Sequence, residues 1–149
     1  MSRPTTCLFC QIVSGVAPAH VVLNRGAVVA FLDIRPVFLG HVLVVPRAHC
    51  ATLVDLPTSM LPELFGEVQR ISAAVERVLG AGGTFVAINN RVSQSVPHLH
   101  VHVVPRTKGD GLRGFFWPRV RYPSDDAAAE TAARLAEALD EPSEQDPHG

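Results

Sequence analysis

One short segment alternates histidine with aliphatic residues, His98-Leu99-His100-Val101-His102-Val103-Val104. In a β-strand, successive side chains point to opposite faces of the sheet. A strand here places His98, His100 and His102 on one face and the aliphatic side chains on the other. The aliphatic face can pack in a core, and we expect the histidine face to be turned towards solvent or a ligand.

Three imidazoles on one face fit three interpretations. They could be an incidental polar surface, although other polar residues would serve as well. Neutral imidazoles two positions apart could also chelate zinc. Finally, an imidazole with an unperturbed pKa of about 6.5 is an available nucleophile at physiological pH.

The residues before this segment favour phosphorus chemistry. Asn89–Pro97 contains small polar residues at a strand entry, where backbone N–H groups can form an anion-binding nest. Gln94 and Ser95 add side-chain donors. A nucleophilic imidazole beside an anion cradle suits phosphoryl or nucleotidyl transfer, in which positioning and electrostatics dominate.

The rest of the pattern predicts an α+β domain with a five-stranded antiparallel sheet. Apolar positions at a period near 3.6 predict one long helix over Ser59–Leu79, capped by Thr58 or Ser59 and stopped by Gly80. A short N-terminal helix is expected over Leu8–Ser14. The expected strands are His20–Leu23, Ala27–Leu32, His41–Val45, Thr84–Ile88 and Leu99–Val104.

Composition and charge limit which domain organisation, binding partners and cellular compartment are expected. The chain has 149 residues, 47% of them hydrophobic, which suits one folded domain over residues 1–125. Residues 126–149 are expected to add a C-terminal helix over Asp125–Leu139 and a disordered acidic tail over Glu141–Gly149. A net charge of −1 gives no footprint for nucleic acid, so local features must hold any anionic ligand. No signal peptide or membrane span is expected, and a cytoplasmic location is the simplest expectation.

Four ordered segments resemble the histidine triad (HIT) superfamily, specifically its Hint-like bacterial branch. The resemblance runs from Cys7 to about Arg106. It implies a HIT-like fold and a homodimer whose two sheets join into one, with a nucleoside monophosphate site in each protomer. The segments are Leu8–Ile12, Ala30–Ile34, Gly40–His49 and Ser93–His102.

The resemblance also implies roles for individual residues. His100 matches the nucleophile, which attacks the α-phosphorus of a purine nucleotide and forms a nucleotidyl-imidazole that water then cleaves. Asp33 matches the residue that binds ribose hydroxyls, although it could instead cap the turn before Pro36. His41 is expected to be structural. Phosphate contacts are expected from His102, Gln94 and Ser95, leaving-group assistance from Gln94 or a histidine, a polar contact from Asn89, and base-pocket lining from Phe9, Ile12, Phe31, Ile34 and Leu43.

Some features depart from the family pattern. Ser93 stands where the family usually has glycine, and the Asn89–Val92 loop is shorter than usual. Both affect phosphate and leaving-group recognition rather than the nucleophile. The Leu112–Arg119 segment lies where relatives contribute specificity from the neighbouring subunit.

Cys7, Cys10, His49 and His98 would make a Cys₂His₂ zinc site, as some bacterial members of the family have. The alternative is a pair of buried, inert thiols, and Cys50 is a spare candidate ligand. An odd number of cysteines argues against a disulfide framework. Zinc held by four protein ligands would be structural, because no coordination position stays open.

Three functions are therefore distinguished. The first is an enzyme that cleaves a nucleoside phosphoramidate, a dinucleoside polyphosphate or a related adenylylated compound. The second is a regulatory protein that binds nucleotides without turnover, and the third is a metalloenzyme that uses all three histidines as ligands. The intact triad favours the first over the second, and the two cysteines with His49 favour a separate zinc site over the third.

Overall fold

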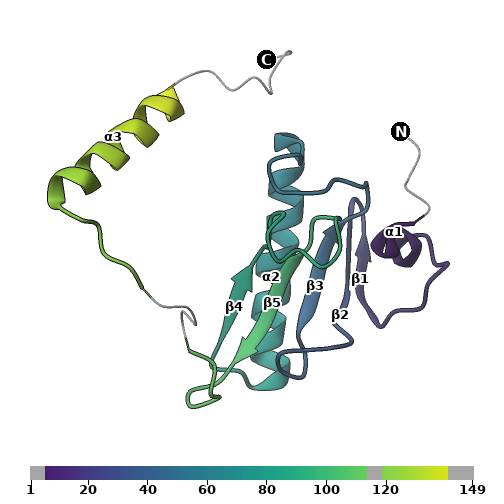
Figure 1. The fold of residues 1–149 in the computed structure, drawn as a ribbon. Helices are drawn as coiled ribbons and strands as arrows, with labels where there is room; N and C mark the ends of the chain where they lie inside the picture. The colour runs from purple at the N-terminus through teal and green to yellow at the C-terminus, as the bar shows by residue number, and fades with distance from the viewer. Residues whose placement is uncertain (1–5, 114–118, 141–149) are drawn as a thin grey trace. The chain divides into compact units, whose positions relative to one another are not determined.

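The computed structural model describes residues 6–113 and 119–140 (Figure 1). Two compact units are present, Met1–Asp110 and Gly111–Gly149. The second unit contains α3 (Asp125–Asp140), which confirms the expected C-terminal helix and buries no side chain. The predicted acidic tail and residues 114–118 of the Leu112–Arg119 segment lie outside the described residues. The boundary placed at residue 125 stays a prediction.

The first unit contains the expected five-stranded antiparallel sheet, in the order β1-β2-β3-β5-β4. β1 and β2 form a hairpin through Gly26, whose positive φ of 54° suits a tight turn. β1 and β4 are the sheet edges. The strands are β1 (Val21–Arg25), β2 (Val28–Leu32), β3 (Val42–Pro46), β4 (Gly83–Ala87) and β5 (Val101–Arg106).

The long helix α2 (Leu61–Leu79) ends as predicted, with Gly80 in the left-handed conformation at φ 68°. The predicted cap is wrong. Thr58 and Ser59 belong to a separate 3₁₀ turn, η1 (Thr58–Met60), and no side chain caps α2 at Met60. Pro62 in the first turn has no N–H to be capped, so less is lost without a capping side chain. No helix among residues 6–113 and 119–140 has the length and apolar character needed to cross a membrane.

The sheet is covered on both faces. On one face lies α2 (Figure 1). Its Leu64, Val68, Ile71 and Val75 pack against alternate strand residues. On the other face, the short helix α1 (Leu8–Val13) and Cys7 form a second cluster, with Phe9 and Cys10 at its centre. The core residues of β2 and β3 divide between these clusters, so both strands are apolar along their whole length.

The histidine segment keeps its predicted alternation of side chains between the two faces. Leu99, Val101 and Val103 are fully buried in the cluster under α2. The strand begins at Val101 rather than Leu99, because the Leu99 N–H donates to the Cys50 carbonyl instead of to the sheet. The histidine face was expected to be turned towards solvent or a ligand, and its first two residues do not face solvent. His98 is 0% exposed and His100 is 2% exposed, because α1 covers this face and brings Phe9 onto both rings.

Candidate functional site

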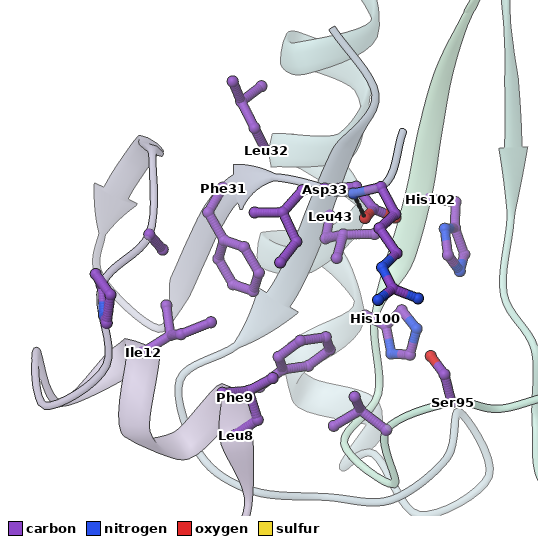
Figure 2. A pocket seen from close by; sticks show the side chains of 15 residues that line it. Leu8, Phe9, Ile12, Phe31, Leu32, Asp33, Leu43, Ser95, His100 and His102 are labelled. Carbon is purple, nitrogen blue, oxygen red and sulfur yellow. Dashed lines mark hydrogen bonds between the residues drawn. The ribbon is translucent and has the colours of Figure 1, made fainter. Parts of the chain in front are cut away.

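A pocket of about 330 Å³ opens on the α1 side of the sheet. Figure 2 shows Phe9, Phe31 and Leu43 on one side of this pocket, and Asp33, Ser95, His100 and His102 on the other. One wall is therefore apolar, and the other offers polar groups. The full lining is Leu8, Phe9, Ile12, Pro18, Ala19, Phe31, Leu32, Asp33, Ile34, Arg35, Leu43, Ser95, Val96, His100 and His102.

His100 is held in one tautomer. Its Nδ1 lies 2.8 Å from the carbonyl oxygen of His98. A carbonyl oxygen can only accept, so Nδ1 carries the proton and Nε2 keeps its lone pair. The Phe9 ring packs edge-on against the imidazole, with the centroids 5.0 Å apart and the planes at 88°. The imidazole is thus fixed in place with an unprotonated nitrogen available for nucleophilic attack.

His102 is the end of a directed chain of hydrogen bonds. The Val37 N–H donates to His41 Nδ1 at 3.1 Å, so the proton of a neutral His41 is on Nε2. His41 Nε2 lies 2.9 Å from His102 Nδ1 and donates to it. The proton of a neutral His102 is therefore on Nε2, a buried atom that has no hydrogen-bond partner among the described residues. A buried N–H without an acceptor is unusual enough to indicate a ligand site.

Both rings of this chain are neutral near pH 7. Burial lowers the pKa of His41, against the opposing pull of the Asp33 carboxylate. Burial, together with the neighbouring His100 and His41, lowers the pKa of His102 to about 4. Protonation of either ring would break the directed chain, because His41 Nδ1 and His102 Nδ1 both act as acceptors. His102 therefore offers one fixed N–H donor.

The contact between His41 and His102 was not predicted from the sequence. His41 is 3% exposed, which fits the structural role expected for it, and its Nε2 lies 2.9 Å from His102 Nδ1. The usable signal was the pairing of β3 with β5, in which Leu43 lies opposite His102. Because His41 precedes β3 by one residue, that register brings it beside the last histidine of the triad.

Asp33 fits both of the roles considered for it. Its Oδ1 accepts from the Arg35 N–H at 2.9 Å, which is the turn-capping contact. Its Oδ2 lies 3.7 Å from His41 Nδ1, and the side chain lines the pocket. One carboxylate oxygen thus braces the loop, while the side chain as a whole faces the space a ligand would occupy.

Gln94 and Asn89 are not among the pocket-lining residues, although a ligand contact was predicted for each. The Gln94 amide is engaged at both ends: Oε1 accepts from the Arg91 N–H at 2.9 Å, and Nε2 donates to the Ala51 carbonyl at 2.6 Å. Arg91 and Ser93 adopt positive φ values of 67° and 60° in this loop. Ser93 thus takes the left-handed conformation that glycine favours, and Gln94 braces it.

The four predicted metal ligands lie together. The ligand atoms of Cys7, Cys10, His49 and His98 are all within 4.8 Å of one another. Zn–S near 2.3 Å and Zn–N near 2.0–2.1 Å in a tetrahedron imply N–N and N–S edges of about 3.3 and 3.6 Å. The structure has 3.2 Å between the two Nδ1 atoms and 3.4–3.5 Å for the three nitrogen–sulfur contacts.

The protonation of His98 also fits a metal ligand. Its Nε2 donates to the Pro46 carbonyl at 2.9 Å, which leaves the Nδ1 lone pair directed at the two sulfurs and at His49. A second hydrogen bond that fixes the ring is typical of metal-bound histidine. Zinc therefore fits these four residues.

The triad does not form one metal site. Two groups of residues in the described parts of the chain have the geometry to hold a metal ion, and neither contains all three histidines. The second group is Asp33, His41 and His102, but its two rings are already joined by a hydrogen bond. This arrangement disfavours a metalloenzyme in which the three triad histidines share one ion.

Residues 14–109 match the family model of the HIT domain. The chain therefore belongs to the histidine triad family, whose fold and triad are those described above. An uncharacterised HIT-like protein of Mycobacterium tuberculosis is 41% identical over 108 residues, which cover 71% of this chain and 75% of that protein.

Two further relatives have names that state an activity. An adenosine 5′-monophosphoramidase of Candida albicans is 28% identical over 79% of this chain and 82% of its own length. An asymmetrical bis(5′-nucleosyl)-tetraphosphatase of Schizosaccharomyces pombe is 40% identical over 54% of this chain, but over only 46% of its own length.

Solved structures share the fold. A HIT family protein of Bacillus subtilis superposes with a TM-score of 0.82 at 29% identity, covering 92% of this chain and 99% of its own. A zinc-bound histidine triad protein of Mycobacterium smegmatis superposes with a TM-score of 0.69 at 37% identity, covering 90% of this chain and 96% of its own.

Proposed function

We propose that this protein is a nucleotide hydrolase or transferase that forms a covalent nucleotidyl-His100 intermediate. Its substrate is a nucleoside phosphoramidate, a dinucleoside polyphosphate or a related adenylylated compound. The observation that carries the proposal is the pairing of a buried imidazole whose Nε2 lone pair is free with an unpartnered N–H donor on the neighbouring His102. The activities named for the Candida and Schizosaccharomyces relatives support the two substrate classes.

Binding would use both walls of the pocket. A purine base fits between the apolar side chains of Phe9, Ile12, Phe31 and Leu43, with Ile34 at the rim. The free oxygen of Asp33 accepts from ribose hydroxyls, as its second oxygen already holds the loop. The α-phosphate then lies against His100, where Ser95 and His102 supply donors to its oxygens.

The reaction proceeds in two displacements. His100 Nε2 donates its lone pair to the α-phosphorus, and the bond from phosphorus to the leaving group breaks with its electron pair. The proton on His100 Nδ1 remains hydrogen-bonded to the His98 carbonyl, which stabilises the cationic ring. Water then attacks the same phosphorus, loses a proton, and releases the nucleoside monophosphate and free His100. Gln94 assists the leaving group in this scheme only if its amide exchanges one of its two hydrogen bonds.

The zinc site would be structural. Cys7, Cys10, His49 and His98 would hold the ion, which would supply a cross-link between the N-terminal segment and the sheet. Phe9 lies between the two cysteines in the sequence, and its ring contacts His100. The cross-link would therefore also hold one wall of the pocket.

The protein is a homodimer in this proposal, with the two sheets joined into one. The edge strands β1 and β4 each have an unpaired side within the described chain, and edge strands need cover or a partner. The cytoplasm is the proposed compartment, because none of the three cysteines forms a disulfide and cysteines stay reduced there.

A turnover screen tests the proposal. Purified protein is incubated with adenylyl and guanylyl phosphoramidates and with dinucleoside polyphosphates, and nucleoside monophosphate is measured. We expect release from at least one class, lost in His100→Ala with nucleotide binding retained. Binding without release from either class would support the regulatory alternative. Activity of His100→Ala within about tenfold of the parent, a barrier change of only about 1.4 kcal/mol, would exclude His100 as the nucleophile.

A further inference from the structure

We propose that Arg35 is a specificity-determining residue that binds the phosphates of the leaving group. The site would then prefer a leaving group that is itself a nucleotide or a polyphosphate chain over an amine. This inference rests on the proposed function, because it concerns the substrate of the same pocket. Arg35 was not among the residues singled out from the sequence.

A polyphosphate bound in this pocket would need a positive charge, and Arg35 can supply it. Among the described residues that line it, Arg35 is the one lysine or arginine, and the Asp33 carboxylate is the one acid. The whole chain has a net charge of −1, so no basic surface compensates. A polyphosphate brings several negative charges past Asp33, and a guanidinium is well suited to bind phosphate oxygens in pairs.

The backbone of Arg35 is held in place. Its N–H donates to Asp33 Oδ1 at 2.9 Å, and the Asp33 N–H donates to the His41 carbonyl at 2.9 Å. Pro36 follows, which restricts Arg35 to extended conformations. The backbone of Arg35 is therefore fixed beside the proposed ribose site and the His41–His102 pair, and its side chain extends from there.

The guanidinium of Arg35 is uncommitted. No hydrogen bond or ion pair joins it to any residue in the described parts of the chain, and the residue is exposed. Two other arginines of the sheet region have partners for their guanidinium groups. Arg47 donates to the Gly26 carbonyl and to Asn24, and Arg106 pairs with Asp110.

The geometry of in-line displacement would direct the leaving group towards Arg35. In-line displacement places the leaving group opposite the attacking nitrogen. His100 lines the pocket and is only 2% exposed, so we infer that the opposite direction leads towards the exposed rim of the pocket. Ile34 is 83% exposed at that rim, and the exposed Arg35 follows it directly. A leaving group that extends outwards therefore passes a free cation.

Equilibrium binding tests the inference without requiring turnover. AMP, α,β-methylene-ADP and α,β-methylene-ATP are titrated into the parent, Arg35→Gln and Arg35→Lys in magnesium-free buffer. His100 would attack the α-phosphorus and break its bond to the bridging oxygen. In these analogues a methylene group replaces that oxygen, so the bond is not cleaved. The matched control is Arg25→Gln, which removes the same charge from an exposed position on β1 outside the pocket.

We expect Arg35→Gln to bind α,β-methylene-ATP at least about tenfold more weakly than the parent, the value for one charged hydrogen bond. AMP binding should change by less than about threefold, because AMP has no phosphate beyond the α position. Arg35→Lys should keep most of the affinity, and Arg25→Gln should match the parent. Equal losses for AMP and the ATP analogue would overturn the inference, as would equal losses in Arg25→Gln and Arg35→Gln.

Turnover separates this inference from the proposed function. Arg35→Gln should lower kcat/KM for a dinucleoside tetraphosphate by about tenfold and leave that for a phosphoramidate within about threefold. Equal reductions for both substrates would reject the role of Arg35 while leaving the nucleophile intact. No turnover of either substrate by the parent would reject the proposed function, and the binding comparison would still decide the role of Arg35.

Discussion

His102→Phe removes the unpartnered N–H of the pocket while keeping an aromatic ring in place. In the parent, this N–H is buried and has no acceptor within the described residues, so a bound phosphate would be its first partner. A hydrogen bond to a charged group contributes about 1.5–3 kcal/mol. The variant should therefore bind AMP about 10- to 150-fold more weakly.

The effect on stability should be small, because two terms oppose each other. Deleting Nε2–H removes a buried donor whose lack of a partner costs about 1–3 kcal/mol. The same substitution deletes the Nδ1 acceptor, so the buried His41 Nε2–H loses its partner at a similar cost. We expect the free energy of unfolding to change by less than about 1 kcal/mol.

Isothermal calorimetry with AMP at pH 7 and urea unfolding of the same preparations measure both quantities. His20→Phe is the matched control, because His20 is exposed and does not line the pocket. It should leave AMP affinity unchanged. AMP affinity of His102→Phe within about threefold of the parent would refute the role of His102 as a phosphate donor.

Three further predictions follow from the same contacts. In competition binding, Asp33→Ala should weaken the affinity for ribonucleotides far more than the affinity for deoxyribonucleotides. Equal losses of affinity would mean that Asp33 only caps the turn. Metal analysis should find one zinc per chain, lost in Cys10→Ser with a lower Tm, whereas a metal-free protein of equal Tm would exclude the site. The folded pKa of His102, about 4, lies below its unfolded value of about 6.5, so the unfolded chain takes up the proton first as the pH falls. As the pH falls from about 6.5 to about 4, the Tm of the parent should therefore fall relative to the Tm of His102→Phe. A Tm difference between the two proteins that stays constant over this range would contradict the low pKa of His102.

Local patterns predicted much of this fold. The alternation around His100 placed Leu99, Val101 and Val103 under α2, because the two-residue period of an extended chain is a local property. The end of α2 at Gly80 was likewise predictable, because glycine takes the left-handed conformation readily. The start of α2 was not, since the 3₁₀ turn before it has no distinct sequence signal.

Contacts between distant segments were harder to predict. The burial of His98 and His100 depends on α1, which is about ninety residues away in the chain and lies across the same face of the sheet. The His41–His102 contact depends on the register between β3 and β5. Gln94 was assigned to phosphate from its nearness in sequence to the triad, but loop geometry turns its amide towards Ala51.

The central claim is that His100 is a nucleophile rather than a general base, and the stereochemistry at phosphorus tests it most directly. A substrate with a chiral phosphorothioate at the α position is hydrolysed in isotopically labelled water, and the configuration of the product is determined. Two in-line displacements each invert the phosphorus, so the covalent route predicts net retention. Net inversion would mean that water attacks in a single step, which would contradict the nucleotidyl-His100 intermediate.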